Sequence, residues 1–184
     1  LLDKLLRFKK QYWRKALSFT EDELVIAAEA DDLAGEESTL ISPEMYRKYI
    51  KPRHQKLFDF IKKEAEGEIY IFYHSCGAVK ELIPDLIEEG IDILNPVQIS
   101  ADNMNLKQLK QEFGQDITFW GGGVDTQATL PYGSPEAVKE EVKRNIEILA
   151  PGGGFVFAAV HNVQADVPPE NFMAMWETLQ DYRN

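Results

Sequence analysis

The chain has 184 residues, which is one ordinary domain's length and enough to bury a hydrophobic core. A formal net charge of −11 argues against nucleic acid and anionic membranes as partners. A single cysteine excludes an internal disulfide, and no apolar run approaches the roughly 20 residues that span a bilayer. We therefore predict a cytoplasmic protein with one domain over residues 1–184. Because the chain opens at Leu1 inside a helical pattern, we expect it to be a piece of a longer protein.

Apolar spacing and capping residues predict five strands that alternate with helices. Residues 1–17 carry apolar side chains at helical spacing. A second helix begins with Ser42 as cap and Pro43 in the first turn, runs to about residue 66 and bends near Pro52. Further helices are expected over 78–89, 104–113, 134–149 and 168–182. Strands are expected near 24–28, 69–73, 91–95, 117–120 and 155–159.

Alternation of strand and helix with short connections predicts parallel strands joined by helical crossovers. Five such units fit either an open doubly wound sheet or the C-terminal five βα units of a TIM (β/α)8 barrel. No Gly-x-Gly-x-x-Gly motif follows the first strand, which disfavours a nucleotide-binding sheet. Polar residues at the strand ends favour the barrel. We therefore predict an α/β fold that is a partial TIM barrel, whose unpaired edges promote self-association or pairing with another chain.

Chemically useful side chains follow every predicted strand. The strand at 69–73 leads into His74 and Cys76, and an imidazole and a thiolate two residues apart suit Zn²⁺. A Cys–His nucleophile pair ranks below zinc, because nothing specific indicates a hydrolase. The other candidates at strand ends are Glu29, Asp31, Asp32, Asn95, Gln98, Asp125, Gln127, His161, Asn162 and Gln164.

Other conspicuous residues fit structural roles better. His54 lies within a predicted helix and is expected to be a surface or packing residue. Trp120 and Trp176 are expected in the core or the barrel wall, and the acidic run over 136–141 fits a solvated helix face.

Several motifs occur together in this chain. They are Asp32–Gly35 with Ile41–Tyr46, His74–Gly77, Gly90–Asn95, Gly121–Gly122 with Asp125, and Gly154–Phe157 with His161–Asn162 and Pro168–Asn171. In combination they resemble the uroporphyrinogen decarboxylase superfamily, which includes zinc-dependent methyltransferases that act on corrinoid proteins and coenzyme M. The resemblance covers nearly the whole chain, and it implies a TIM barrel whose first three βα units are missing here.

In the methyltransferase branch the resemblance implies that His74 and Cys76 bind zinc, together with a cysteine after the last strand. This chain has no second cysteine, and His161 falls near that place, so the expected metal ligands are His74, Cys76 and His161. The expected catalytic residues are Asp31, Asp32 and His161. The expected substrate-binding residues are Asn95, Gln98, Asp125, Gln127 and Asn162. The implied reaction moves a methyl group from a methylated corrinoid, carried by a corrinoid protein, to a thiol or similar small acceptor.

Two alternatives remain open. In the decarboxylase branch, which belongs to porphyrin biosynthesis, a Gly-His-Gly after the last strand offers its histidine to a porphyrinogen carboxylate. His161 matches that histidine, although its neighbours are Val160 and Asn162. The chain would then decarboxylate a tetrapyrrole without a cofactor. The other alternative is a structural fragment of a larger enzyme, inactive alone because three eighths of the barrel wall are absent.

Overall fold

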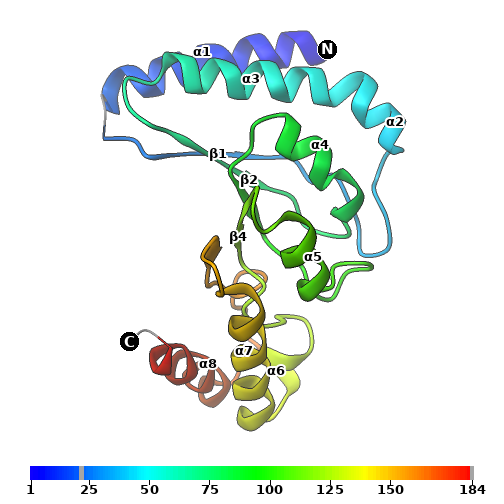
Figure 1. Cartoon of the computed structure of the whole chain (residues 1–184), viewed down its shortest axis with the longest axis vertical. Coiled ribbons are helices and arrows are strands. Elements are labelled where there is room, and N and C mark those ends of the chain that lie inside the picture. Colours follow the sequence, from blue (N-terminus) through cyan, green and yellow to red (C-terminus); the bar gives the residue numbers. More distant parts are fainter. Residues whose placement is uncertain (21–22, 183–184) are drawn as a thin grey trace.

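The computed structural model describes residues 1–20 and 23–182 and shows one sheet of five parallel strands with helices between them (Figure 1). The strands are β1 Ile26–Ala30, β2 Tyr70–His74, β3 Ile93–Asn95, β4 Thr118–Trp120 and β5 Phe155–Val156. Their spatial order is their order in the sequence. This confirms the predicted arc of a barrel and excludes the doubly wound sheet, whose order reverses at a switch point.

The six predicted helices are present, the one over 78–89 as a 3₁₀ turn and a short helix, and a further short helix over 129–132 was not predicted. The described helices are α1 Leu2–Thr20, α2 Pro43–Met45, α3 Lys51–Glu64, α4 Ile83–Glu88, α5 Leu106–Phe113, α6 Thr129–Tyr132, α7 Pro135–Leu149 and α8 Pro169–Asp181, with a π-helical turn η1 Tyr46–Ile50 and a 3₁₀ turn η2 Lys80–Leu82. Ser42 and Ser134 cap α2 and α7 as expected, by accepting from backbone N–H groups three residues later. The bend near Pro52 takes the form of the turn η1, because proline gives no N–H to the carbonyl four residues earlier.

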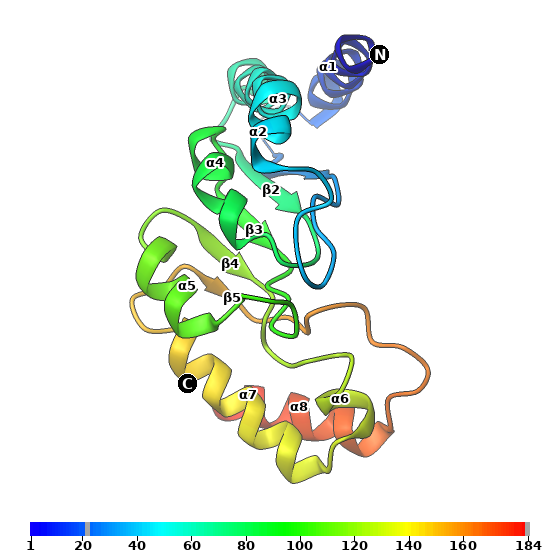
Figure 2. The same ribbon diagram turned by 90° about the vertical axis from the view of Figure 1, so that its right-hand side faces the viewer.

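The two faces of the sheet are covered unequally. Tyr73, Leu94 and Phe119 point toward the helical layer and are at most 1% exposed. Their strand neighbours His74 and Trp120 point to the opposite, concave face and are only half-buried. In Figure 2, α4 and α5 lie on one side of the strands, and no described helix covers the concave side. The concave face is therefore the side on which the interior of the partial barrel lies.

Some structural assignments need correction. Trp176 is 45% exposed on α8, so its placement in the core was wrong: α8 buries the side that carries Ala174 and Met175 against α7. Trp120 does lie in the wall, edge-on to Phe72. The prediction of a solvated acidic face over 136–141 is wrong for Glu141, which is only 9% exposed. Its carboxylate accepts hydrogen bonds from Asp125 N–H and Thr129 Oγ1.

The strands β1 and β5 each pair on one side only within the described part of the chain. This agrees with an open arc, and self-association through these edges stays a prediction. None of the described helices has both the length and the apolar character that crossing a membrane requires.

Candidate metal centre

Asp32, His74 and Cys76 come together just beyond the C-terminal ends of β1 and β2. One ligand atom from each residue lies within 4.8 Å of the other two. His74 Nε2 and Cys76 Sγ are 3.5 Å apart. A tetrahedral Zn²⁺ with bonds of about 2.0 Å to nitrogen and 2.3 Å to sulfur would hold these two atoms about 3.5 Å apart. The donor types and this spacing therefore fit zinc with three protein ligands and one position left open.

The neighbours of His74 fix its ring for metal binding. Asn95 Nδ2 donates to the carbonyl of Trp120 at 2.8 Å, so Asn95 Oδ1 must face His74 Nδ1, at 2.7 Å. An amide oxygen only accepts, and Nδ1 therefore carries the proton of a neutral ring. The lone pair of Nε2 is then free on the side of Cys76 Sγ. A hydrogen-bonded second nitrogen is the usual support of a metal-binding histidine.

The strand register and the turn at Gly77 place His74 and Cys76 side by side at the C-terminal end of β2. His74 pairs with Ala30 of β1 and Asn95 of β3 at the end of the sheet. The chain then turns at Gly77, whose φ of +89° is in the left-handed region. A Cβ on Gly77 would meet the carbonyl oxygen of Gly35 at 2.4 Å, so only glycine fits this turn. The tight turn keeps Cys76 at the mouth of the arc beside His74.

The segment that carries Asp32 is held on both sides. Asp31 N–H donates to the carbonyl of His74 at 3.2 Å, and Leu33 N–H donates to Ser75 Oγ at 3.0 Å. Asp32 Oδ1 accepts from the backbone N–H of Cys76 at 3.3 Å. These bonds join the end of β1 to the end of β2 and place an exposed carboxylate beside the thiol. Burial raises the pKa of the Cys76 thiol, and the charges of Asp32 and Glu36 raise it further.

A cavity of about 310 Å³ opens beside Cys76. Its walls are Cys76, Gln98, Thr126, Gln127, Val160, His161, Asn162 and Gln164. His161 and Asn162 are exposed on the segment after β5, which backbone hydrogen bonds tie to the loop after β4. His161 therefore lies at the cavity wall and is not part of the group that Asp32, His74 and Cys76 form. The structure groups Asp32, and not His161, with His74 and Cys76, and the role of His161 as third zinc ligand stays a prediction.

Glu36 was not predicted to belong to the site, and its carboxylate joins two residues that were, Gln98 and Gln127. Glu36 Oε1 accepts from Gln98 Nε2 at 2.7 Å and from Gln127 Nε2 at 2.8 Å. Gln98 is buried, and its Oε1 accepts from Gly77 N–H at 2.7 Å. Gln98 thus braces the turn after Cys76, while Gln127 lines the cavity. No sequence signal marks Glu36, because an acidic residue in a Gly-Glu-Glu-Ser turn is ordinary surface.

Asp125 does not line the cavity. Its Oδ1 accepts from Gln127 N–H at 2.8 Å, and its own N–H donates to Glu141 Oε1 at 2.6 Å. Asp125 therefore shapes the loop after β4 that presents Gln127. Its role as a substrate-binding residue stays a prediction.

His54 is not a surface residue. It is 7% exposed, and its Nε2 donates to Asp31 Oδ2 at 2.9 Å. The side chain of Asp31, an expected catalytic residue, is thus directed toward α3, whereas Asp32 is directed toward Cys76. The sequence could not show this pairing, because the two residues are 23 positions apart and lie on different elements.

The comparisons with known proteins agree on the family. The sequence model described as "Uroporphyrinogen decarboxylase (URO-D)" matches residues 3–182. The chain is 27% identical over 141 residues to a uroporphyrinogen decarboxylase of Geobacter sulfurreducens, covering 76% of this chain and 38% of that protein. It is 31% identical over 137 residues to a methylated-thiol–coenzyme M methyltransferase of Methanosarcina mazei, covering 74% of this chain and 33% of that protein.

A solved structure has the same fold. A methyltransferase from Methanosarcina mazei superimposes with a TM-score of 0.71 at 22% identity, over 97% of this chain and 48% of that chain. The chain thus spans about a third to a half of the length of these relatives. With the family model matched almost from end to end, the chain belongs to the uroporphyrinogen decarboxylase (URO-D) family and has part of its TIM-barrel fold.

Proposed function

We propose that the chain carries the zinc-binding part of a methyltransferase that moves a methyl group from a methylated corrinoid to a thiol or similar acceptor. The observation that carries this proposal is the group of Asp32, His74 and Cys76, with its 3.5 Å spacing of nitrogen and sulfur. The name of the Methanosarcina mazei relative, methylated-thiol–coenzyme M methyltransferase, supports a thiol as acceptor. The activity belongs to the whole protein, of which this chain resembles one part.

Different residues of the site would hold the metal, orient its ligands and bind the acceptor. Asp32, His74 and Cys76 would hold the metal, and Asn95 keeps the His74 ring in the tautomer that binds it. Zinc, when bound, lowers the pKa of a coordinated thiol and so supplies a thiolate at neutral pH. The cavity beside Cys76 is the space in which the acceptor would bind.

The polar wall of that cavity would orient the acceptor. Gln127 gives its NH₂ group to Glu36, which leaves its amide oxygen as an acceptor for the ligand. His161 and Asn162 stand on the opposite segment, where they offer further hydrogen bonds to the ligand. These contacts would position the acceptor so that its sulfur forms the new bond to the methyl carbon, while the cobalt–carbon bond of the corrinoid breaks and leaves its electron pair on cobalt.

Decarboxylation of a tetrapyrrole is the second candidate, and the name of the Geobacter sulfurreducens relative supports it. His161 is available at the cavity wall for a substrate carboxylate. This candidate gives no role to the thiol of Cys76 or to the orienting bond between Asn95 and His74. We therefore rank it below methyl transfer.

Metal removal separates the two candidates. We expect the natural full-length protein to contain one zinc ion per chain and to demethylate methylcobalamin with coenzyme M as acceptor. Treatment with a chelator should abolish this reaction, and added Zn²⁺ should restore it, because the thiol acceptor reacts as a thiolate. Metal content is measured by atomic emission, and demethylation by the change in corrinoid absorbance. A metal-free protein that decarboxylates uroporphyrinogen would contradict the proposal and support the second candidate.

A further inference from the structure

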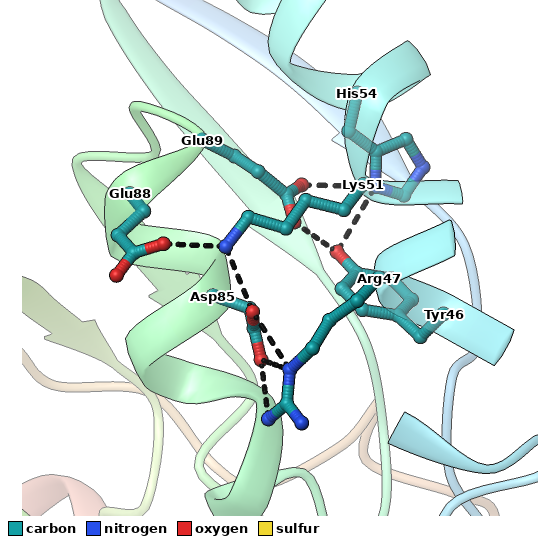
Figure 3. Close-up of polar contacts among 7 residues, drawn as sticks. All are labelled: Tyr46, Arg47, Lys51, His54, Asp85, Glu88 and Glu89. Carbon is teal, nitrogen blue, oxygen red and sulfur yellow. Dashed lines mark hydrogen bonds and ion pairs between the residues drawn. The ribbon is translucent and has the colours of Figure 1, made fainter. Parts of the chain in front are cut away.

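A buried cluster of polar side chains lies behind the metal group, between α3, α4 and the turn η1 (Figure 3). His54 is at its centre. Its Nδ1 lies 3.2 Å from Glu89 Oε2, while its Nε2 lies 2.9 Å from Asp31 Oδ2. Tyr46 donates its hydroxyl to Glu89 Oε1 at 2.6 Å. The side chain of Glu89 is fully buried, so this cluster fixes His54 firmly in the helical layer.

Both ring nitrogens of His54 face carboxylate oxygens, which only accept hydrogen bonds. A neutral imidazole has one N–H and could satisfy one of them, and the Tyr46 hydroxyl, 3.3 Å from Nδ1, is donated to Glu89, so the doubly protonated ring fits both carboxylate contacts. Burial lowers the pKa of His54, but the hydrogen bonds and charges of Asp31 and Glu89 outweigh burial and raise it. Phe58 and Tyr73 pack against the ring and leave it one orientation. The charged His54 ring thus joins Asp31 to Glu89, and the packing of Phe58 and Tyr73 holds the ring in place. We call this link the His54 clamp.

We propose that His54 is a positioning residue of the metal centre: by holding Asp31, it holds the backbone of residues 31–32 and so keeps the Asp32 carboxylate beside His74 and Cys76. Asp31 and Asp32 are adjacent, and their side chains point to opposite supports, α3 and the loop after β2. On its other side the segment is anchored by Leu33 N–H on Ser75. Without the His54 clamp, Asp31 would lose its only side-chain hydrogen bond among those described, and only contacts with the end of β2 and the loop after it would hold residues 31–33.

This inference rests on the proposed function, because it assigns His54 a role only if Asp32, His74 and Cys76 bind zinc. It differs from ordinary stabilisation in one respect. A clamp that works through Asp32 has nothing left to act on once the Asp32 carboxylate is removed. The effects of changing His54 and Asp32 on zinc affinity should therefore not multiply, whereas independent effects do.

The test is a double-mutant cycle on zinc affinity in the natural full-length protein. Competition with a chromophoric chelator gives the affinity of the wild type, His54→Gln, Asp32→Ala and the double variant. His54→Gln should bind zinc about 10–100-fold more weakly, as is typical when a supporting partner of a ligand is lost, and Asp32→Ala, which removes a ligand itself, should lose more. The double variant should bind no more weakly than Asp32→Ala. Glutamine keeps a polar side chain of similar length that can still donate a hydrogen bond, and circular dichroism establishes that each variant is folded before the affinities are compared.

Cobalt substitution supplies a readout that a merely structural role would not change. Cys76 is untouched in all four proteins, so the sulfur-to-cobalt charge-transfer band should remain. The ligand-field bands of His54→Gln should shift toward those of Asp32→Ala. Lys51→Met is the matched control, since it removes the ion pairs of α3 with Asp85 and Glu88 but not the contact with Asp31, and it should leave affinity and spectrum unchanged (Figure 3).

The possible failures are distinguishable. If the wild type binds zinc and the losses in the cycle multiply, or if His54→Gln binds zinc like the wild type, the inference about His54 is overturned and the methyltransferase proposal stands. If the wild type binds no zinc while correctly folded, both are overturned.

Discussion

The Cys76→Ala protein is expected to lose zinc and methyl transfer together. Cys76 supplies the only thiol in the chain, and its Sγ lies 3.5 Å from His74 Nε2, the spacing that a shared zinc ion would give. Removing a direct ligand should weaken zinc binding by more than the roughly 10–100-fold that loss of a supporting partner costs. Zinc content after dialysis and the rate of methylcobalamin demethylation measure the two losses.

His161→Ala is the informative comparison for this experiment. The structure places His161 at the cavity wall and outside the metal group, so this variant should keep its zinc while its turnover falls. Loss of zinc from His161→Ala would restore the ligand set that the sequence analysis predicted. Full zinc occupancy and full turnover in Cys76→Ala would refute the proposed function.

The Glu89→Ala protein should be strongly destabilised. Glu89 is 1% exposed, and its carboxylate accepts from both Tyr46 and the protonated His54. Removing one partner of a buried ion pair typically costs about 3–5 kcal/mol of unfolding free energy. We expect a loss in this range, measured by urea unfolding. Glu89→Gln, which can still accept from Tyr46, should lose less.

Glu88→Ala is the matched control for the buried cluster. Glu88 precedes Glu89 on α4 and pairs with Lys51, but 71% of its side chain is exposed. Exposed ion pairs contribute about 0–1 kcal/mol, so the two neighbouring substitutions should differ by several-fold in cost. Equal losses of unfolding free energy in Glu88→Ala and Glu89→Ala would show that the buried cluster around His54 stabilises the fold no more than an exposed ion pair does.

The fold was predictable because its signals are local. Continuous apolar runs mark strands covered on both faces, and the serine caps of α2 and α7 act within three residues. The alternation of elements predicted parallel strands, and their order followed from the polar strand ends and the missing Gly-x-Gly-x-x-Gly motif, which favoured a barrel over a doubly wound sheet. Trp176 was misplaced because hydrophobicity alone does not show which side of the last helix has a neighbour.

The candidate site was predictable only in part. His74 and Cys76 are two residues apart at one strand end, so the sequence shows their proximity directly. The third member of the group depends on the path of two loops, and there the sequence favoured His161 where the structure places Asp32.

Two supporting residues could not be found from the sequence at all. Glu36 meets Gln98 and Gln127 at separations of 62 and 91 residues, and His54 meets Glu89 at 35. Such contacts depend on tertiary packing, and no local pattern of residues encodes them. The side chains that support the metal group from behind therefore become visible only in the folded chain.

X-ray absorption at the zinc edge tests the central claim, a zinc centre built from Asp32, His74 and Cys76, most directly. The natural full-length protein without added thiol should show a single sulfur at about 2.3 Å, with nitrogen and oxygen at about 2.0–2.2 Å as the other neighbours. The sulfur should disappear in Cys76→Ala protein reloaded with zinc. A spectrum with no sulfur neighbour, or with two or more, would contradict the ligand set.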